Sequence, residues 1–316
     1  MVVPFPAGER SSYKPPGDTN SLHRRQPDSA MISRLTRLLK RPAVYPVVHR
    51  LIALPRYLTL YRVFRNWRDT RGLRRWTTAD QLRFDFYRQF IRADELVFDI
   101  GANVGNRAKI FLRLGARVVA FEPQSPCADL LHRELSGNAS FRLVRKALGA
   151  SIGTAELRIA NAHYLSTMSD DWIAATRKSG RFGDAQWEKR QQVAVTTFDE
   201  AIREFGAPVF AKIDVEGFEP QVLAGLTGRV ASGSLEFAAE ALDQAMLCLE
   251  RLDSLFPCVF QFSEAESMRF CWQSWLSLSE ARTALRALVG RDAYAWGDIY
   301  FRATDLKTGD PTGRYP

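Results

Sequence analysis

The sequence predicts an α/β protein, with a doubly wound, mostly parallel seven-stranded sheet, helices on both faces and a basic helical extension in front. Two observations predict this fold class. Short apolar runs recur from residue 96 onward and are separated by helix-length segments, which is typical of parallel strands joined by helical crossovers. The chain of 316 residues is 46% hydrophobic, enough to bury one sizeable core, so we expect one main domain.

Apolar runs mark the predicted strands, at 96–100, 117–122, 141–148, 208–215, 234–240 and 258–264. We expect a further strand at 295–303, which could be antiparallel. A helix should precede the first strand, because Leu82, Phe86 and Phe90 recur on one helical face; Thr78 or Asp80 is its expected N-cap. Another helical segment is expected around 277–288.

The segment 150–207 differs from the alternating pattern. It contains two further predicted strands, at 154–160 and 191–200, which flank polar residues 161–190. It is longer than an ordinary crossover, and long excursions often carry substrate contacts. We therefore expect an insertion that forms the substrate region of a domain spanning residues 77–305.

The two ends of the chain have a different composition. Residues 1–30 are rich in Pro, Gly and Ser and predict a disordered tail, with Met31 as an alternative start; residues 306–316 predict a flexible tail. Residues 31–76 carry twelve Lys or Arg against one acid, Asp69, and predict basic amphipathic helices. These helices could pack on the main domain, lie on an anionic membrane surface or contact nucleic acid. Their uncharged runs are too short to span a bilayer.

The four cysteines do not indicate a metal or cluster site. Their spacing fits neither paired metal ligands nor an iron–sulfur cluster; they are Cys127, Cys248, Cys258 and Cys271. Free thiols in a reducing cytoplasm are the expected state. We therefore expect a cytoplasmic protein, with a peripheral position at the inner membrane surface as the further option that the basic segment offers.

The stretch "VFDIGANVG" places Asp99 at a strand end, followed by Gly101, Asn103 and Gly105. In a doubly wound sheet, the loop after the first strand lies at the ligand-binding switch point. Glu122 ends the second strand, 21 residues beyond Gly101, where an acid can accept hydrogen bonds from ribose hydroxyls. The loop departs from the dinucleotide Gly-x-Gly-x-x-Gly fingerprint at two of its glycine positions.

Four blocks occur in order over roughly residues 90–265: "VFDIGANVG", "VVAFEPQ", "VTTFDE" and "KIDVEGFEPQVLAGL". In this arrangement the chain resembles the FkbM family of methyltransferases. The resemblance implies a class I, Rossmann-like methyltransferase fold. It also implies transfer of a methyl group from S-adenosylmethionine, usually to an oxygen of a sugar, polyketide or other small natural product.

The resemblance also implies roles for individual residues near the cofactor. Gly101, Asn103 and Gly105 would cradle its methionine part, and Glu122 would hold its ribose. Asp99 would lie beside its amino group or order the loop. Ala147, near the end of the third predicted strand, is a candidate contact of the adenine.

Four residues are candidates for the chemical step. Asp214 ends the fourth predicted strand and could orient the acceptor hydroxyl or take its proton; alternatively it forms an ion pair, for which Lys212 is available. Glu216 lies in the following turn. Glu240 would face the same cleft from the fifth strand end, or begin the next helix as a solvated acid. His163 in the insertion could serve as a base or simply be exposed.

No metal is predicted, because no histidine pair or tight acidic cluster is evident, although Asp214, Glu216 and Glu240 together could bind a hard cation. The expected partner is a small-molecule, sugar or lipid-linked glycan acceptor. Nucleic acid is not expected, since an Asp-Pro-Pro-Tyr type motif is missing. Two other functions stay open. One is a methyltransferase-like binding protein that acts through residues 31–76. The other is an NAD-dependent oxidoreductase or epimerase, against which the absence of a Tyr-x-x-x-Lys pair from this sequence counts.

Overall fold

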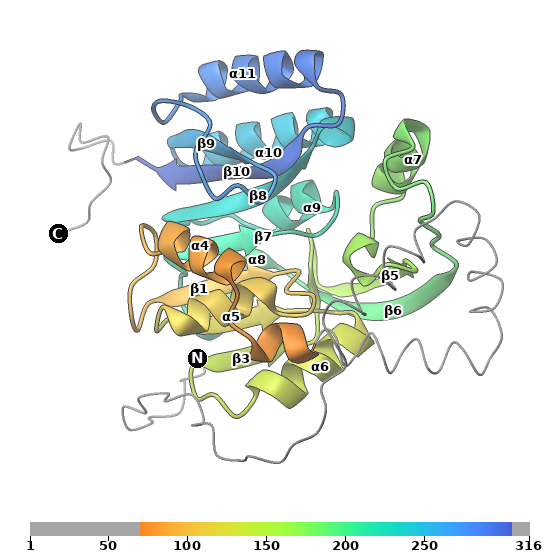
Figure 1. The fold of residues 1–316 in the computed structure, drawn as a ribbon, viewed down its shortest axis with the longest axis vertical. Helices are drawn as coiled ribbons and strands as arrows, with labels where there is room; N and C mark the ends of the chain where they lie inside the picture. The colour runs from red at the N-terminus through yellow and green to blue at the C-terminus, as the bar shows by residue number, and fades with distance from the viewer. Residues whose placement is uncertain (1–69, 305–316) are drawn as a thin grey trace. The chain divides into compact units, whose positions relative to one another are not determined.

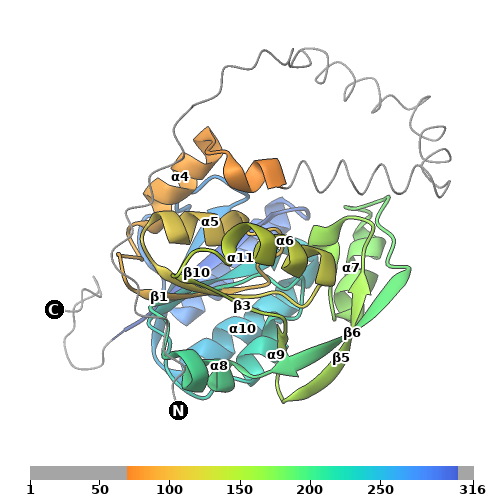
Figure 2. The same cartoon turned by 90° about the horizontal axis from the view of Figure 1, so that it is seen from below.

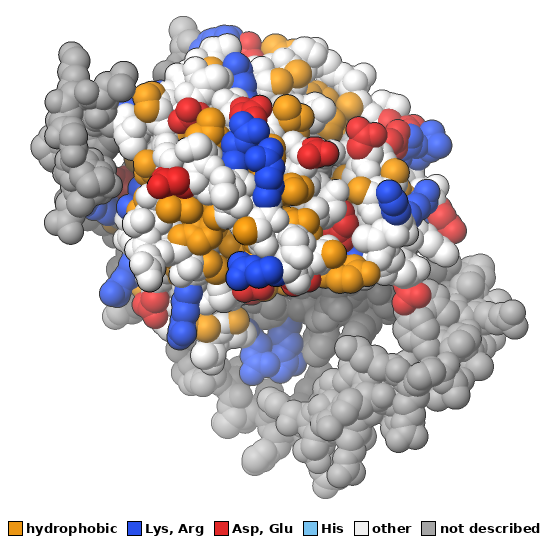
Figure 3. Space-filling model, turned by 90° about the horizontal axis from the view of Figure 1, so that it is seen from above, with side chains coloured by type: hydrophobic (Ala, Val, Ile, Leu, Met, Phe, Trp, Pro, Cys, Tyr) orange, Lys and Arg blue, Asp and Glu red, His pale blue; other side chains and the backbone are white. Residues whose placement is uncertain are grey.

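The structure, a computed structural model, describes residues 70–304. The predicted tails at 1–30 and 306–316, and residues 31–69 of the basic segment, lie outside the described residues. None of the helices in the described part of the chain is long and apolar enough to cross a membrane. On the face shown in Figure 3, basic and acidic side chains of the described residues are interspersed among apolar ones.

Within residues 70–304, one sheet has seven strands in the order β3-β2-β1-β7-β8-β10-β9 (Figure 1). Their bounds are β1 Leu96–Ile100, β2 Arg117–Phe121, β3 Phe141–Val144, β7 Phe210–Ile213, β8 Ser232–Ala238, β9 Cys258–Glu264 and β10 Trp296–Ala303. β1 pairs in parallel with β2 and β7, and β10 runs antiparallel to β8 and β9. The predicted doubly wound sheet is confirmed, with its switch point between β1 and β7.

Helices cover both faces of this sheet (Figure 2). One face carries α4 Thr78–Tyr87, α5 Asn106–Arg113 and α6 Ser125–Leu135; the other carries α8 Phe198–Phe205, α9 Glu219–Ala224, α10 Leu242–Leu255 and α11 Leu278–Arg291. Successive residues of β1 point to opposite faces, so Val97 packs with the α4 and α5 side and Phe98 with the α8 side. Each face therefore has its own apolar core.

The strand predicted at 141–148 is wrong as a single element. β3 ends at Val144 in the main sheet, and Ala147 and Leu148 form β4 in a separate three-stranded sheet of order β4-β6-β5. Ala147 pairs with Val195 of β6, so the chain leaves the main sheet between the two short strands.

The two strands predicted within the insertion are confirmed. They are β5 Gly153–Ile159 and β6 Lys189–Thr196, and they pair in antiparallel fashion. Between them lie the short helix η1 His163–Leu165 and the helix α7 Asp170–Ser179. The insertion is therefore an ordered unit that extends the small sheet beside the carboxyl ends of the main strands.

Two element ends differ from the predicted ones. The N-cap of α4 is Thr77, whose hydroxyl accepts the backbone N–H of Asp80 while the Asp80 carboxylate accepts the N–H of Thr77. β8 ends at Ala238, so Glu240 lies beyond the strand in a short 3-10 helix, η2 Ala239–Ala241. The second difference matters for the site.

Candidate functional site

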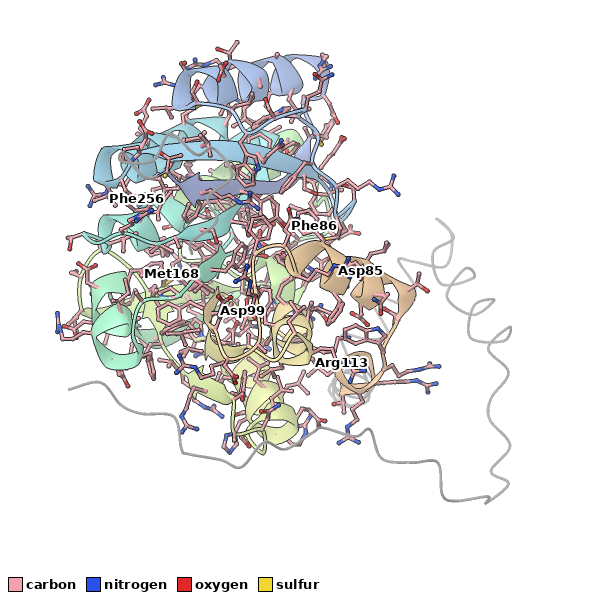
Figure 4. All side chains as sticks on the ribbon, turned by 90° about the vertical axis from the view of Figure 1, so that its left-hand side faces the viewer. Asp85, Phe86, Asp99, Arg113, Met168 and Phe256 are labelled. Carbon is pink, nitrogen blue, oxygen red and sulfur yellow. The ribbon has the colours of Figure 1, made fainter. Side chains whose placement is uncertain are left out.

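A cavity of about 330 Å³ lies at the carboxyl ends of the parallel strands. The loop after β1, the end of β2, β4, the insertion, the turn after β7 and one residue of β8 all line it. This volume is in the range of small-molecule and cofactor pockets. Asp99 and Met168, both labelled in Figure 4, line it from β1 and from the insertion.

The loop after β1 has the unusual backbone that its sequence predicts. Gly101, Asn103 and Gly105 all have positive φ angles, of 82°, 51° and 85°. A Cβ on Gly101 would lie 1.9 Å from the carbonyl oxygen of Asp214, and one on Gly105 would lie 2.6 Å from a methyl group of Leu131. Contacts with other protein atoms therefore leave no room for a side chain at either position, so both residues must be glycine. Gly101 and Asn103 line the cavity, whereas Gly105 caps α5 from behind it.

Glu122 at the end of β2 lines the cavity and is 5% exposed. One carboxylate oxygen accepts the backbone N–H of Asn103 at 2.6 Å, and the other accepts the N–H of Gln124 at 2.7 Å. Burial raises the pKa of Glu122 to about 7, although both hydrogen bonds oppose this rise. Each carboxylate oxygen keeps lone pairs for hydroxyl donors of a ligand.

Asp99 in β1 is 2% exposed and also lines the cavity. Its Oδ2 atom is buried and has no hydrogen-bond partner among the described residues. Burial raises the pKa of Asp99 to about 7, against the opposing effect of Lys212 and Arg107. A buried acceptor oxygen without a donor is costly, so this atom is suited to a donor supplied by a ligand.

Three carboxyl groups converge where β7 and β8 end. Asp214 follows β7, Glu216 lies in the next turn with a φ angle of 55°, and Glu236 belongs to β8. Oxygen atoms of all three lie within 4.8 Å of one another, and all three residues line the cavity. Burial, followed by the charge of Asp214, raises the pKa values of Glu216 and Glu236 well above the ordinary range.

Lys212 explains why Asp214 differs from its two neighbours. The Lys212 ammonium lies 3.0 Å from Asp214 Oδ2 and 3.0 Å from Asp298 Oδ1. Burial by itself would raise the pKa of Asp214, but the charge and hydrogen bond of Lys212 bring it below its ordinary value. The cluster therefore combines one carboxylate that stays ionised with two carboxyl groups that favour the protonated form.

The insertion closes one side of the cavity. His163, at the start of η1, lines it, and the carbonyl of His163 accepts the side-chain amide of Asn103 at 3.4 Å. The Thr167 hydroxyl donates to the carbonyl of Glu216 at 2.7 Å. A Cβ on Gly217 would lie 2.5 Å from Trp172 of α7. The insertion is thus fixed against the turn that carries Glu216.

The structure places most predicted site residues together. Those that line the cavity are Asp99, Gly101, Asn103, Glu122, Ala147, His163, Asp214 and Glu216. Glu240 does not line it, which corrects its expected position at the cleft. Because β8 ends before it, Glu240 turns to Arg181, which donates to both of its carboxylate oxygens, one of them at 2.8 Å. Glu240 therefore joins the insertion to η2.

Sequence reasoning missed Glu236. It occupies the middle of "SLEFAAE", two residues before the strand end in the structure. A glutamate inside a run that should be buried on both faces is itself a signal of a functional role, because such strands are normally apolar throughout. Arg107, Lys212 and Asp298 were likewise not among the predicted site residues; Arg107 lines the cavity, whereas Lys212 and Asp298 lie behind its wall.

The three carboxylates also correct the expectation that the chain has no tight acidic cluster. Carboxylate oxygens are the ligands that hard divalent cations prefer. Proximity of acids occurs without an ion as well, and by itself the arrangement does not define a cation site.

Residues 99–240 match the family described as Methyltransferase FkbM domain. No curated protein matches the chain.

Several solved structures are similar to this chain at low sequence identity. A TehB-like SAM-dependent methyltransferase from Corynebacterium glutamicum is 10% identical with a TM-score of 0.37, covering 77% of this chain and 96% of its own. Precorrin-6y C5,15-methyltransferase from Geobacter metallireducens is 11% identical with a TM-score of 0.35, covering 70% and 87%. The plantazolicin methyltransferase BpumL in complex with SAH is 9% identical with a TM-score of 0.33, covering 87% and 100%.

Proposed function

Because residues 99–240 are an FkbM methyltransferase domain and the chain is an S-adenosylmethionine-dependent methyltransferase, we propose that it methylates a hydroxyl oxygen. The proposed acceptor is a sugar, a glycan or another small natural product, with a lipid-linked glycan as one form. The alternatives are a methyltransferase-like protein that acts only by binding and an NAD-dependent oxidoreductase or epimerase.

The residues of the cavity fit S-adenosylmethionine. The unpartnered Oδ2 of Asp99 can accept a hydrogen bond from the ammonium group of the cofactor. The N-terminus of α5 has no side-chain cap, so its backbone N–H groups and dipole suit the cofactor's carboxylate. The Glu122 carboxylate can accept the ribose hydroxyls. Ala147 in β4 and the neighbouring Leu148 offer apolar contact for the adenine.

When bound, S-adenosylmethionine supplies a methyl group on a positively charged sulfur. An acceptor oxygen attacks the methyl carbon in line with the sulfur, which leaves as the neutral thioether. The protein must hold the acceptor hydroxyl in line and receive its proton. Asp214 is ionised and lines the cavity, so its carboxylate can accept the hydroxyl hydrogen and take the proton. Protonated Glu216 and Glu236 can donate hydrogen bonds to other acceptor oxygens, which favours an acceptor with several hydroxyls.

One observation carries the proposal of transfer to oxygen. Three carboxyl groups of unequal protonation face one cavity, beside the loop and the strand-end acid that fit the cofactor. Such pairs of acids with separated pKa values divide proton acceptance from hydrogen-bond donation. An exposed aromatic ring, Tyr164, lies at the insertion side of the same cavity and could stack on a sugar ring.

Labelled methyl transfer tests the proposal. The full chain is incubated with methyl-tritiated S-adenosylmethionine and a panel of methyl glycosides, cyclic polyols and phenols. We expect label in at least one hydroxyl compound, in a form that resists mild base, because an ether is stable where an ester is cleaved. Label that mild base releases, or that is found on nitrogen, would contradict transfer to a hydroxyl. Transfer lost in Asp214→Asn but kept in Asp243→Asn, an exposed control on α10, identifies the acid.

We also propose that the enzyme acts in the cytoplasm and contacts an anionic membrane surface through residues 31–76. The support is the charge of this segment, most of which lies outside the described residues. In sedimentation with vesicles of phosphatidylglycerol and phosphatidylcholine at low salt, the full chain should pellet with the vesicles. A shortened chain that begins at Thr77 should remain in the supernatant. Equal pelleting of both chains would exclude this role of the segment.

A further inference from the structure

A buried lysine lies directly behind the acid of the proposed hydroxyl site. Lys212 is 1% exposed, although lysine side chains are almost never fully buried without a partner. Its ammonium lies 3.0 Å from Asp214 and 3.0 Å from Asp298. The Asp214 side chain is 37% exposed and lines the cavity, whereas the Asp298 side chain is 7% exposed and does not line it. Lys212 thus joins an acid inside the cavity to one outside it.

Sheet register explains how these three side chains meet. Lys212 of β7 lies beside Ser234 of β8, and Ser234 lies beside Tyr300 of β10. Residues that are two apart share a face, so Asp298 points to the same side of β10 as Tyr300. The strands, rather than a mobile loop, therefore set the position of Lys212 and Asp298.

Asp298 is itself held in place. The Tyr300 hydroxyl donates to Asp298 Oδ2 at 3.3 Å, and Tyr300 contacts the Tyr87 hydroxyl at 3.3 Å. Arg107 lies 3.9 Å from Asp298 and binds Glu266 at 2.8 Å. The Lys212 ammonium is consequently anchored from behind by a fixed carboxylate, and its remaining hydrogen-bonding capacity is directed at Asp214.

Charged and titratable groups surround Asp214 on the packed elements. The acids are Asp99 of β1, Glu122 after β2, Glu216, Glu219 of α9, Glu236 of β8 and Asp298 of β10; the cations are Arg107 of α5 and Lys212, with the Tyr87 phenol of α4 beside them. Within the described residues Lys212 is the one cation bonded to Asp214. Burial opposes the ionisation of Asp214, whereas Lys212, and after it a hydrogen bond from Glu236 and the charge of Arg107, favour it, so loss of Lys212 should raise the pKa of Asp214.

We propose that Lys212 is a positioning residue for methyl transfer: clamped by Asp298, its ammonium keeps the Asp214 carboxylate ionised and oriented toward the acceptor hydroxyl. The inference rests on the proposed role of Asp214 in accepting the hydroxyl proton. It assigns Lys212 no contact with substrate or cofactor. It also differs from a simple buried ion pair, in which Lys212 and Asp298 would only stabilise the fold.

Labelling of carboxyl groups tests this inference without an acceptor. The full chain is treated with a water-soluble carbodiimide and glycinamide between pH 3.5 and 8, and mass spectrometry with fragmentation reports the labelled fraction of Asp214 separately from Glu216. An ionised, lysine-bonded carboxylate reacts slowly and a protonated one rapidly. The variants are Lys212→Met, Lys212→Arg and Asp298→Asn, with Lys178→Met on the exposed face of α7 as the matched control.

Lys212→Met should move the labelling midpoint of Asp214 to higher pH by about 1–3 units, the usual effect of an opposite charge at this distance. Lys212→Arg and Lys178→Met should stay near the parent. Asp298→Asn should shift the midpoint to lower pH, because it removes a negative charge and leaves the ammonium to Asp214 alone. Coinciding midpoints in Lys212→Met and the parent, or shifts of Lys212→Met and Asp298→Asn in the same direction, would overturn the proposal.

Calorimetry with S-adenosylmethionine and circular dichroism establish that each variant is folded. If Lys212→Met fails to fold, Asp298→Asn provides the test. At the pH where Asp214 of the parent is half-labelled, a lower labelled fraction of Asp214 in Asp298→Asn supports the proposal, and an equal or higher fraction overturns it. Failure of transfer to hydroxyl compounds would leave the labelling result unaffected, so the two proposals fail independently.

Discussion

The backbone N–H of Asn103 donates to the carboxylate of Glu122 at 2.6 Å. This bond joins the loop after β1 to the acid that ends β2, across the sheet edge where the two strands are neighbours. The left-handed backbone at Asn103 presents its N–H to the acid. The cofactor loop and the expected ribose acceptor are therefore one hydrogen-bonded unit before any ligand binds.

Affinity for S-adenosylmethionine should rise with pH. Burial raises the pKa values of Asp99 and Glu122 to about 7, so both are partly protonated at neutral pH. The ammonium and hydroxyl groups of the cofactor donate hydrogen bonds that favour the ionised carboxylates. They therefore lower the pKa values of Asp99 and Glu122 in the complex, so binding releases protons. Below pH 7 each released proton should strengthen binding by about tenfold per pH unit.

Isothermal titration between pH 5.5 and 8, in buffers of different ionisation enthalpy, counts the released protons. Proton release should shrink above pH 7, once both acids are ionised in the free protein. Affinity that is constant over this range, or that falls as the pH rises, would show that neither acid changes its protonation on binding.

Asp214→Asn should abolish most turnover while sparing cofactor binding. The amide keeps the shape of the side chain but cannot take a proton, and loss of a general base typically costs about 10²–10⁴-fold. Initial rates with an acceptor from the labelled panel, beside calorimetry with S-adenosylmethionine, measure the two effects. If the turnover of Asp214→Asn stays within tenfold of the parent, Asp214 is not the base, and Glu216 or Glu236 takes that role.

Gly101→Ala should destabilise the protein itself. The added Cβ would meet the carbonyl oxygen of Asp214 at 1.9 Å, and the φ angle of 82° is unfavourable for alanine. We expect a loss of about 1–3 kcal/mol in the free energy of unfolding, measured by urea denaturation. Gly228→Ala is the control, because nothing lies within 4 Å of its added Cβ. Equal stability of the two variants would mean that the loop can move away from β7.

Removal of divalent cations should leave the enzyme unchanged. Lys212 already supplies a positive charge to Asp214, and raised pKa values relieve the repulsion at Glu216 and Glu236. Dialysis against EDTA should therefore preserve cofactor affinity and transfer. Activity that is lost on dialysis and restored by Mg²⁺ would instead make the three carboxylates ligands of an ion.

The positions of most strands along the chain, and the mostly parallel sheet, could be predicted from the sequence, because buried parallel strands are nearly continuous apolar runs and their crossovers have helix length. The loop residues and Glu122 were found for a related reason: topology alone brings the ends of β1 and β2 to the switch point. These features depend on patterns within short stretches of the chain.

Features set by distant residues could not be predicted in the same way. Glu240 was assigned to the cleft, but its partner Arg181 lies 59 residues earlier in sequence. The departure of Ala147 from the main sheet depends on its pairing with Val195. Lys212 had an evident neighbour in Asp214, whereas its second partner, Asp298, is 86 residues away.

The cavity should bind S-adenosylmethionine through the β1 loop and Glu122. Calorimetric titration of the full chain with S-adenosylmethionine and, separately, with NAD tests it most directly. We expect one S-adenosylmethionine site per chain and no heat with NAD. The affinity for S-adenosylmethionine should be about 10–100-fold weaker in Glu122→Ala, the usual cost of a lost hydrogen bond to a charged group. Binding of NAD without binding of S-adenosylmethionine would contradict it.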